Sequence, residues 1–500
     1  MTLAKTRLAY RDLPDFFYSD IEASSALNYQ RWASNPALAD AIGLPKNWLE
    51  SESALKVLSG QQTLSGDKPL AMAYAGHQFG HWSGLLGDGR ASLVGDIVDS
   101  LGVYHELHLK GSGPTPYSRR GDGKATLGSA IREYLVSESL HALGIPTTRA
   151  LSILTTGENI MRNDAEPGAI LCRSAKSHIR VGTFQLAAAS QAPVSQAPAS
   201  QDNGHIKALA DFTIERLYPD APASGPERYL HLLRQAIAGQ VTLISKWMGF
   251  GFIHGVMNTD NALLSGETID YGPCAFMDAF HPGKVFSSID RNGRYAWNRQ
   301  PEIANWNMVR LAESLLPLLG DTQEAQSQNA ERELEQFSPK FIETFNVIMA
   351  RKFGLAVEAF SGGEFLGDTF GLMTNAQVDY TLFFRRLTQI AGGQSPEAFL
   401  KLFEIRADGE AWLEMWKTLA DDNGGDKTER LSGMRTSNPI IIARNHRVEA
   451  AISAANNGNM EVFEILLKAI TNPFAERDEF AQYETPPDAN EVVRQTYCGT

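Results

Sequence analysis

The sequence predicts an α+β fold in which a β-rich segment in the first third of the chain precedes a mostly helical remainder. Between residues 70 and 175 several short runs rich in β-branched residues are separated by glycine-containing turns. From about residue 305 onward, apolar residues recur with helical spacing. A chain of 500 residues is longer than one ordinary domain, so two or three packed units are expected.

Composition narrows the class of protein. Hydrophobic residues make up 43% and charged residues 21%, which is typical of a soluble globular protein. The net charge of −13 disfavours nucleic acid or an anionic membrane as the main partner. No run approaches the roughly 20 apolar residues of a membrane span, and the N-terminal residues lack the apolar core of a secretory signal. We therefore expect a cytoplasmic protein, and a monomer.

The elements of the first third follow in chain order. Residues 1–70 predict a helical extension, in which "SNPALADAIGLP" (34–45) ends on a Gly-Leu-Pro stop. The runs "ASLVGDIV" (91–98) and "VYHELHLK" (103–110) predict a β-hairpin. Alternation along the second run places Lys110 on one polar face with Glu106 and His108.

Helices and strands are also predicted farther along the chain. Residues 127–146 predict a helix that stops at a Gly-Ile-Pro sequence. Low complexity over residues 187–204 predicts a disordered surface insertion. Further strands are predicted at 150–161 and 168–173, and further helices at 229–255, 308–319, 345–355 and 438–455.

The run "HGVMNTDNALL" (254–264) matches the catalytic loop of protein kinases except at one position. That loop reads H-R-D-x-x-x-x-N, with the Asp as catalytic base and the Asn as a metal ligand. His254 and Asn261 keep the spacing, whereas Val256 stands where the base belongs and cannot accept a proton. Asp270 follows nine residues after Asn261, in the place of the metal-binding Asp of the kinase D-F-G. Asn261 and Asp270 offer oxygen ligands that suit Mg²⁺ or Mn²⁺.

The other parts of a kinase-type nucleotide site occur upstream in the same order. Gly87 and Gly89 precede a predicted strand, where glycines let the backbone approach phosphates, although an isolated pair is more often a hairpin turn. Lys110 ends the next strand, as the phosphate-binding Lys of kinases does. In the following helix, Glu133 is the candidate partner of this Lys, and Glu138 is a rival.

Two further segments carry cations that suit phosphate. The loop "SRRGDGKATLG" (118–128) contains Asp122 and Gly123 among three basic residues. Arg173 and Arg180 lie seven residues apart, so on a helix they would share a face. An arginine fork donates hydrogen bonds in pairs, which matches a phosphate.

The order of these parts predicts a protein-kinase-like bilobal fold with added N-terminal and C-terminal helical regions. We place an N-terminal helical extension at 1–70 and the kinase-like N-lobe at 71–165. The core of the C-lobe would span 166–310 and contain the insertion, and a helical region with a redox tail would span 311–500.

Four long motifs closely resemble the selenoprotein O family of bacterial and mitochondrial pseudokinases. They are "AYAGHQFGHWSGLLGDGRA", "ELHLKGSGPTPYSRRGDGKA", "GFIHGVMNTDN" and "IDYGPCAFMD". The resemblance implies a nucleotide bound in reverse, Asp260 as the catalytic base, Asn261 and Asp270 as metal ligands, and an ion pair between Glu133 and Lys110. The resemblance also implies a set of nucleotide contacts, which includes the proposed metal ligand. They are Gly87, Gly89, Arg90, Lys110, Asp122, Gly123, Arg173, Arg180 and Asp270.

The activity that this resemblance implies is transfer of AMP from ATP to Ser, Thr or Tyr hydroxyls of proteins. Transfer of UMP from UTP is also ascribed to the family, so the nucleotide stays open, as does the choice between Mg²⁺ and Mn²⁺. One alternative is a catalytically inactive nucleotide-binding scaffold, which the valine in the catalytic loop equally permits. A second is a small-molecule phosphotransferase, but such enzymes keep the Asp that Val256 replaces.

Three cysteines are too few for the disulfide framework of a secreted protein. Cys498 lies third from the C-terminus, and Cys274 lies just past the D-F-G-like motif. In the resembling family these positions form a bridge, which here would close a span of 224 residues and gate substrate access. Two unlinked thiols are the alternative.

Overall fold

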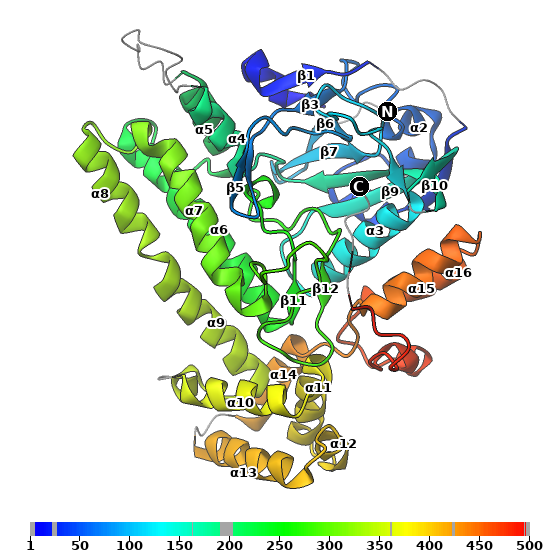
Figure 1. Cartoon of the computed structure of the whole chain (residues 1–500), viewed down its shortest axis with the longest axis vertical. Helices are drawn as coiled ribbons and strands as arrows, with labels where there is room; N and C mark the ends of the chain where they lie inside the picture. The colour runs from blue at the N-terminus through cyan, green and yellow to red at the C-terminus, as the bar shows by residue number, and fades with distance from the viewer. Residues whose placement is uncertain are drawn as a thin grey trace.

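The computed structural model describes residues 6–22, 28–162, 164–190, 204–360, 363–422, 426–494 and 496. It places a large sheet at one end of the molecule and a stack of helices at the other (Figure 1). The strands are β1 Tyr18–Asp20, β2 Gln30–Ser34, β3 Leu70–Met72, β4 Gly76–Gln78, β5 His81–Ser83, β6 Ala91–Val98, β7 Tyr104–Lys110, β8 Ala125–Thr126, β9 Arg149–Met161, β10 Ala165–Ala175, β11 Phe252–Ile253 and β12 Ala275–Phe276.

Most of the chain between and after these strands is helical. The α-helices are α1 Pro36–Ala41, α2 Glu52–Leu58, α3 Leu127–Ala142, α4 Val181–Ala189, α5 Gly204–Leu217, α6 Pro226–Gly249, α7 Gln300–Leu315, α8 Gln323–Leu334, α9 Phe337–Phe353, α10 Glu364–Asn375, α11 Tyr380–Ala391, α12 Glu397–Leu400, α13 Arg406–Asp422, α14 Lys427–Ser437, α15 Asn445–Asn456 and α16 Glu461–Ile470. Mixed helix and sheet of this kind confirm the predicted α+β class.

The main sheet has eight strands in the order β1-β3-β6-β7-β10-β9-β2, with β8 paired to β10. Its two edge strands, β1 and β2, come from the first 34 residues. The prediction that residues 1–70 are helical is therefore incomplete, although α1 and α2 lie there as well. These strands are only three and five residues long, which is too short for an alternating pattern to stand out in the sequence.

The predicted hairpin is confirmed, because β6 and β7 pair antiparallel from Ala91 opposite Lys110 to Val98 opposite Tyr104. Leu107 and Leu109 lie in an apolar cluster beneath α1 and α2. Glu106 and His108 alternate with them and are fully buried, so the polar face of β7 points into the protein. This inward polar face is what brings charged groups to the candidate site.

The helix predicted over residues 127–146 is present as α3, which crosses one face of the sheet. The predicted strands at 150–161 and 168–173 are also present, as β9 and β10, which pair with each other. The predicted C-terminal helix begins later than expected, because residues 438–444 are not helical and α15 starts at Asn445. Pro439 follows Asn438 and restricts that residue to extended conformations.

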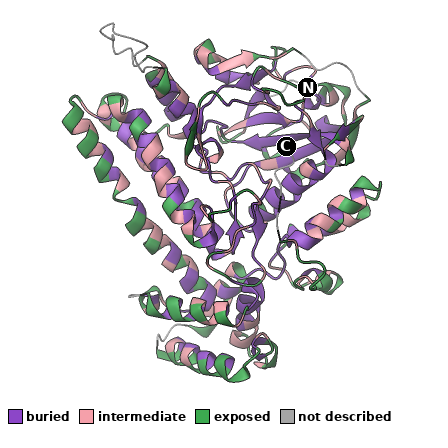
Figure 2. Ribbon diagram, in the orientation of Figure 1, coloured by how far each residue is buried: buried purple, intermediate pink, exposed green. Residues whose placement is uncertain are grey.

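Helices α15 and α16 pack against α3 on the side away from the sheet. Most of α3 is buried between the two, as the purple ribbon in Figure 2 shows. Arg132 in α3 donates to the side-chain oxygen of Asn445 at 3.0 Å and pairs with Glu449, and both partners lie in α15. The C-terminal region thus supports the helix that carries Glu133.

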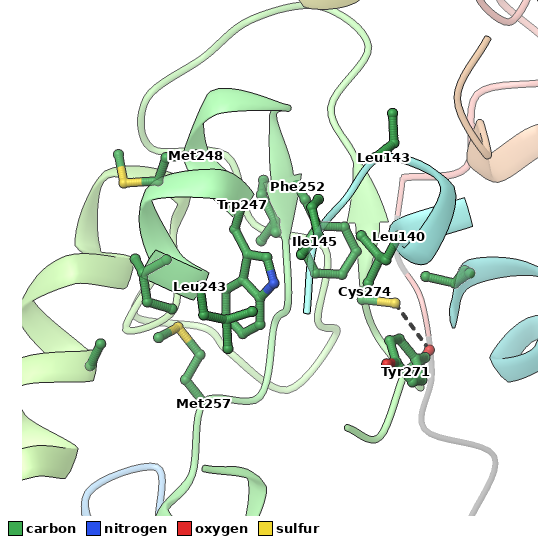
Figure 3. Close-up of a cluster of buried hydrophobic side chains, with 14 of the residues drawn as sticks. Leu140, Leu143, Ile145, Leu243, Trp247, Met248, Phe252, Met257, Tyr271 and Cys274 are labelled. Carbon is green, nitrogen blue, oxygen red and sulfur yellow. Dashed lines mark hydrogen bonds between the residues drawn. The ribbon is translucent and has the colours of Figure 1, made fainter. Parts of the chain in front are cut away.

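A cluster of apolar side chains joins the end of α3 to the helical part of the molecule (Figure 3). Leu140 and Ile145 face Phe252 and Trp247, and Tyr271 lies at the edge of the cluster. All five side chains are at least nine-tenths buried. This contact fixes the sheet relative to the segment that carries residues 254–270.

Two predictions concern the surface. The first three residues of the predicted insertion belong to α4, and residues 191–203 lie outside the described residues. Among the described residues, no helix combines the length and the apolar character that crossing a membrane requires.

Candidate active site

Three charged side chains from distant parts of the chain meet at the end of β7. The Lys110 ammonium donates to Glu133 Oε2 at 2.6 Å and to Asp270 Oδ1 at 2.8 Å. Glu138, the rival partner, instead accepts two hydrogen bonds from Arg149. The structure therefore pairs Lys110 with Glu133 and adds Asp270 to the same group.

Two arginines complete this group. Arg173 Nη1 donates to Glu133 Oε1 and to Asp270 Oδ1, each at 2.9 Å. Arg180 Nη1 lies 3.6 Å from Asp270 Oδ2. The expectation that both arginines share a helical face is wrong, since Arg173 lies in strand β10 and Arg180 caps the start of α4. They converge on Asp270 because the chain turns between strand and helix.

The cluster of Lys110, Glu133, Arg173, Arg180 and Asp270 is called the charge cluster below. Burial alone would raise the pKa of Asp270, but Lys110, Arg173 and Arg180 lower the pKa well below its ordinary value. Asp270 also has a φ of +63°, in the left-handed region that non-glycine residues seldom adopt. Such backbone conformations concentrate at functional sites.

A second layer of polar residues, which sequence reasoning missed, orients the arginines. His108 Nδ1 accepts from Arg173 Nε at 3.2 Å, and burial lowers the pKa of His108. His108 Nε2 donates to Asp88 Oδ2 at 3.0 Å, and Asp88 Oδ1 lies 3.5 Å from Arg180. Arg180 also stacks over the Tyr74 ring at 4.4 Å. The sequence does offer one signal for Asp88, which lies between the two predicted phosphate-binding glycines.

The catalytic-loop residues lie beside the charge cluster, on the short 3₁₀ helix Thr259–Asn261. The backbone carbonyl of Asp260 accepts from Arg180 Nη1 at 2.8 Å. Oδ2 of Asp260 accepts from Gln78 Nε2 at 3.1 Å, whereas Oδ1 is buried with no hydrogen-bond partner among the described residues. Burial raises the pKa of Asp260 to about 6, against the lowering effect of Arg180.

His254 and Val256 form the first turn of this loop. His254 Nε2 donates to the carbonyl of Ile269, the residue before Asp270, at 2.8 Å, and its ring stacks on Trp247. Nδ1 accepts from the backbone N–H of Val256 at 3.3 Å. The histidine therefore holds the loop and the Asp270 segment together, while the valine contributes no titratable group.

The glycine loop is closely packed. Gly87 has a φ of +72°, and a Cβ there would lie 2.4 Å from the ring of Tyr117. A Cβ on Gly89 would approach the Tyr117 carbonyl at 2.9 Å. Packing therefore explains both glycines, and contact with phosphate remains a prediction, as it does for the half-buried Arg90.

The second predicted phosphate loop has its own partners. Asp122 accepts from both terminal nitrogens of Arg162, at 2.9 Å and 3.0 Å, and is exposed. Gly123 packs on the backbone of Gly113, which a Cβ would approach at 2.2 Å. No hydrogen bond or ion pair between this loop and the charge cluster occurs in the part of the chain that the structure describes. The nucleotide contacts expected of Asp122 and Gly123 therefore stay predictions.

A divalent metal ion has two candidate ligands here. Lys110 and Arg173 both bind Oδ1 of Asp270, which leaves Oδ2 for other partners. The amide nitrogen of Asn261 donates to the carbonyl of Val256 at 2.9 Å, so the amide oxygen is the atom left for a cation. Within the described ranges, no group of three His, Cys, Asp or Glu could hold a metal alone. The residues fit a metal ion that shares its ligands with nucleotide phosphates, as Mg²⁺ sites often do.

Of the two proposed redox residues, the structure describes Cys274. Cys274 is buried, and its sulfur lies 3.2 Å from the carbonyl oxygen of Tyr271 (Figure 3). Cys498 lies outside the described residues. Thr496, two positions earlier, donates its hydroxyl to the Pro273 carbonyl at 2.6 Å. The C-terminal segment therefore reaches the residue next to Cys274, and the bridge itself stays a prediction.

Comparison with known proteins gives a consistent result. Residues 2–471 match the family model described as "Protein adenylyltransferase SelO". The chain is 45% identical to the protein nucleotidyltransferase YdiU of Rhodopseudomonas palustris (strain BisB18), over 98% of both chains. It is 46% identical to the protein of the same name from Bradyrhizobium sp. (strain BTAi1), again over 98% of both chains. For that of Shewanella denitrificans the identity is 44%, over 98% of this chain and 97% of the relative.

Proposed function

The chain belongs to the SelO family of protein adenylyltransferases, and on that premise we propose that it transfers a nucleoside monophosphate to hydroxyl groups of proteins. In its most specific form the proposal is AMP transfer from ATP to Ser, Thr or Tyr, with UMP from UTP as the other donor. The observation that carries it is the combination of an intact charge cluster with a catalytic loop in which Val256 replaces the kinase base.

We propose a kinase-like bilobal arrangement as the framework of this site. The contact between the hairpin-strand Lys110 and Glu133 of α3 supports it, as does the His254 contact with the residue before Asp270. In protein kinases the same kinds of residue meet in the same chain order. The apolar cluster of Figure 3 would join the two lobes at the end of α3.

The proposed reaction is a displacement at the α-phosphorus of the nucleotide. The acceptor hydroxyl oxygen forms a bond to that phosphorus, and the bond to the oxygen bridging the α- and β-phosphates breaks. Pyrophosphate leaves with that electron pair, and Asp260 takes the proton of the hydroxyl. The Asp260 carboxylate suits this role, since one of its oxygens has no hydrogen-bond partner among the described residues and its pKa is raised. A general base works best when its pKa lies near the ambient pH.

The cations of the charge cluster would neutralise the phosphates during this step. Lys110 and Arg173 are each held by two carboxylates, so their positions are fixed before the nucleotide arrives. Prepositioned charge of this kind stabilises a transition state without reorganisation. Asn261 and Asp270 would hold Mg²⁺ or Mn²⁺, which when bound supplies further positive charge to the phosphates.

Several properties remain proposals that rest on the sequence and the family. They include a Cys274–Cys498 bridge that gates access, a nucleotide held in reverse by the two glycine-containing loops, and action in the cytoplasm as a monomer with no nucleic-acid or membrane partner. Non-reducing peptide mapping of the oxidised protein tests the bridge. Alkylation of both cysteines under those conditions would contradict it.

The central test uses ATP labelled at either phosphate. The protein is incubated with α-³²P-ATP or γ-³²P-ATP, with each metal in turn, and labelled protein is counted, including the enzyme itself. Label from the α position alone supports nucleotidyl transfer. Label from the γ position alone would make the protein an ordinary kinase, and no label from either form would favour the inactive scaffold. Repetition with α-³²P-UTP decides between the two nucleotides.

A further inference from the structure

The hairpin formed by β4 and β5 lies over the catalytic loop. His77 N–H donates to Thr259 Oγ1 at 2.7 Å, and Phe79 N–H donates to Asn258 Oδ1 at 3.0 Å. Gly76 has no room for a Cβ, which would lie 2.6 Å from Thr259 Oγ1. Together with the Gln78 bond to Asp260, these contacts fix the hairpin to three consecutive residues of the loop.

The turn of this hairpin is strained. Phe79 has a φ of +52° and Gly80 a φ of +84°, so both central residues of the two-residue turn are in the left-handed region. Glycine or asparagine is usual at such positions, and a bulky phenylalanine is unfavourable. The strain is tolerated because Phe79 N–H also donates to Tyr295 Oη at 3.1 Å and the two rings pack 5.1 Å apart. The fold thus holds this hairpin in one position at an energetic cost.

The hairpin, α7 and the segment before α7 together form a surface of rings and guanidinium groups. The ring of His77 packs edge-on against Trp82 at 5.1 Å and against Trp306 at 5.2 Å. Arg294 and Arg310 lie over the Trp306 ring at 4.9 Å and 5.0 Å. These five residues are called the aromatic–arginine surface.

Trp82 is the exposed member of this surface, and the other four residues, which include the two arginines, are half-buried. Trp82 is 48% exposed, and tryptophan is enriched at binding interfaces. Arg310 pairs with Glu313, whereas Arg294 makes no ion pair with any residue that the structure describes. In a chain with a net charge of −13, a guanidinium that no carboxylate of the described residues neutralises attracts a ligand of negative charge.

We propose that the aromatic–arginine surface binds the acceptor polypeptide, and that it selects segments in which acidic residues flank the hydroxyl. The proposal rests on the proposed nucleotidyl transfer and names the side of the site from which the acceptor enters. Trp82 packs on the peptide, Arg294 pairs with its carboxylates, and Gln78 is a positioning residue that turns Asp260 toward the hydroxyl.

The experiment uses the full-length protein with α-³²P-ATP and oriented peptide libraries. Each library carries one central Ser, Thr or Tyr, and the flanking positions are enriched in Glu, Gln or Lys. We expect Glu-flanked peptides to be labelled about tenfold more efficiently than Lys-flanked ones. Trp82→Ala should raise KM for the Glu-flanked peptide about tenfold, and Arg294→Gln should remove the preference for Glu. Neither change should alter nucleotide Kd, measured by calorimetry.

Matched controls isolate the surface from general effects. Leu101→Ala removes an apolar side chain that is 86% exposed at the far end of the β6–β7 hairpin. Arg299→Gln removes an exposed arginine that pairs with Glu302. Both should leave KM and the Glu preference unchanged. For Gln78→Ala we expect a lower kcat with unchanged KM for peptide and unchanged nucleotide Kd, a split that simple loss of folded protein would not produce.

Three results would overturn the inference. They are a preference for Lys-flanked peptides, variants with unchanged KM for peptides, or a Trp82→Ala variant that weakens nucleotide binding instead, which would make the surface a base-stacking site. In each case label still reaches protein, so the proposed function survives. If no peptide and no protein, including the enzyme itself, takes label from the α position, the proposed function fails and this inference fails with it.

Discussion

Asp260 and Asp270 lie ten residues apart at the same site, and the protein treats them in opposite ways. Asp270 is contacted by three cations, which hold its pKa well below the ordinary value. Asp260 contacts one glutamine side chain and retains a buried oxygen without a partner, and burial raises its pKa to about 6. One carboxylate is therefore built to stay charged and the other to gain and lose a proton. Divergent pKa values of this kind mark different chemical roles.

The largest effect is expected from Asp270, because three cations and the proposed metal depend on it. Asp270→Ala should lower the rate of α-label transfer by about 10³-fold or more. It should also weaken nucleotide binding in the presence of Mg²⁺, measured by calorimetry. Asp278→Ala is a useful comparison, since this nearby aspartate pairs with Arg444 in the helical region. An Asp270→Ala enzyme within tenfold of wild type would remove Asp270 from the proposed metal site.

Asp260→Asn removes the proton acceptor and keeps the shape of the side chain. We expect a rate loss of about 10²-fold, the lower end for a general base, with nucleotide Kd unchanged. Single-turnover transfer to a peptide acceptor measures the step directly. If this variant instead lost nucleotide binding and kept its turnover, the contrast between the two aspartates would be wrong.

Two glutamates on α3 provide a matched pair. Glu133 binds Lys110 and Arg173 in the charge cluster, whereas Glu138, five residues later, binds Arg149. Glu133→Gln leaves two buried cations short of one negative charge, so we expect a loss of transfer rate of about tenfold. Glu138→Gln should lower the midpoint of thermal unfolding and leave kcat unchanged. Equal losses of kcat in both variants would show that α3 acts through its stability alone.

Lys352 tests whether burial alone can set a protonation state, and its expected effect is the smallest. Burial lowers its pKa from 10.5 to about 7, and no carboxylate pairs with it among the described residues, although the Phe384 ring lies 4.2 Å away. Between about pH 7 and pH 10.5 the unfolded chain therefore binds one more proton than the folded protein, so stability rises with pH there.

Replacing this lysine should remove the pH dependence. Lys352→Met should stabilise the protein by about 1 kcal/mol at pH 6 and by progressively less as the pH approaches 10. Urea unfolding at pH 6, 8 and 9.5 measures the difference. Lys417→Met, at an exposed lysine of α13 that pairs with Glu414, should show no such trend. A stabilisation that stays the same from pH 6 to pH 9.5 would mean that the buried lysine stays charged.

Much of the fold follows from local patterns in the sequence. The β6–β7 hairpin, α3, β9 and β10 are predictable because each contains a run of β-prone residues or a helical spacing of apolar residues, and each element is seven or more residues long. The edge strands β1 and β2 are not, because strands of three and five residues owe their structure to pairing with distant segments.

In the candidate site, too, some residues are predictable from sequence patterns and others depend on distant segments. Lys110, Glu133 and Asp270 are predictable from motif order, and the structure brings them together. The roles of His108 and Asp88 depend on a hydrogen-bond chain that only the folded sheet creates. No sequence pattern identifies Gln78 or Arg294. Gln78 is important because it contacts Asp260, 182 positions away, and Arg294 because it lies over the ring of Trp306 in another element.

The support of α3 by α15 determines which part of the chain can work as an enzyme. The Arg132–Asn445 bond joins residues 313 positions apart, and Arg132 is buried. A fragment that ended before α15 would leave this guanidinium under the sheet-bound helix without its carboxylate and amide, a costly arrangement. The helix carrying Glu133 would then lose its outer support, so isolating the sheet-bearing half should not yield a small working catalyst. Engineering of this protein has to treat the whole chain as the minimal unit.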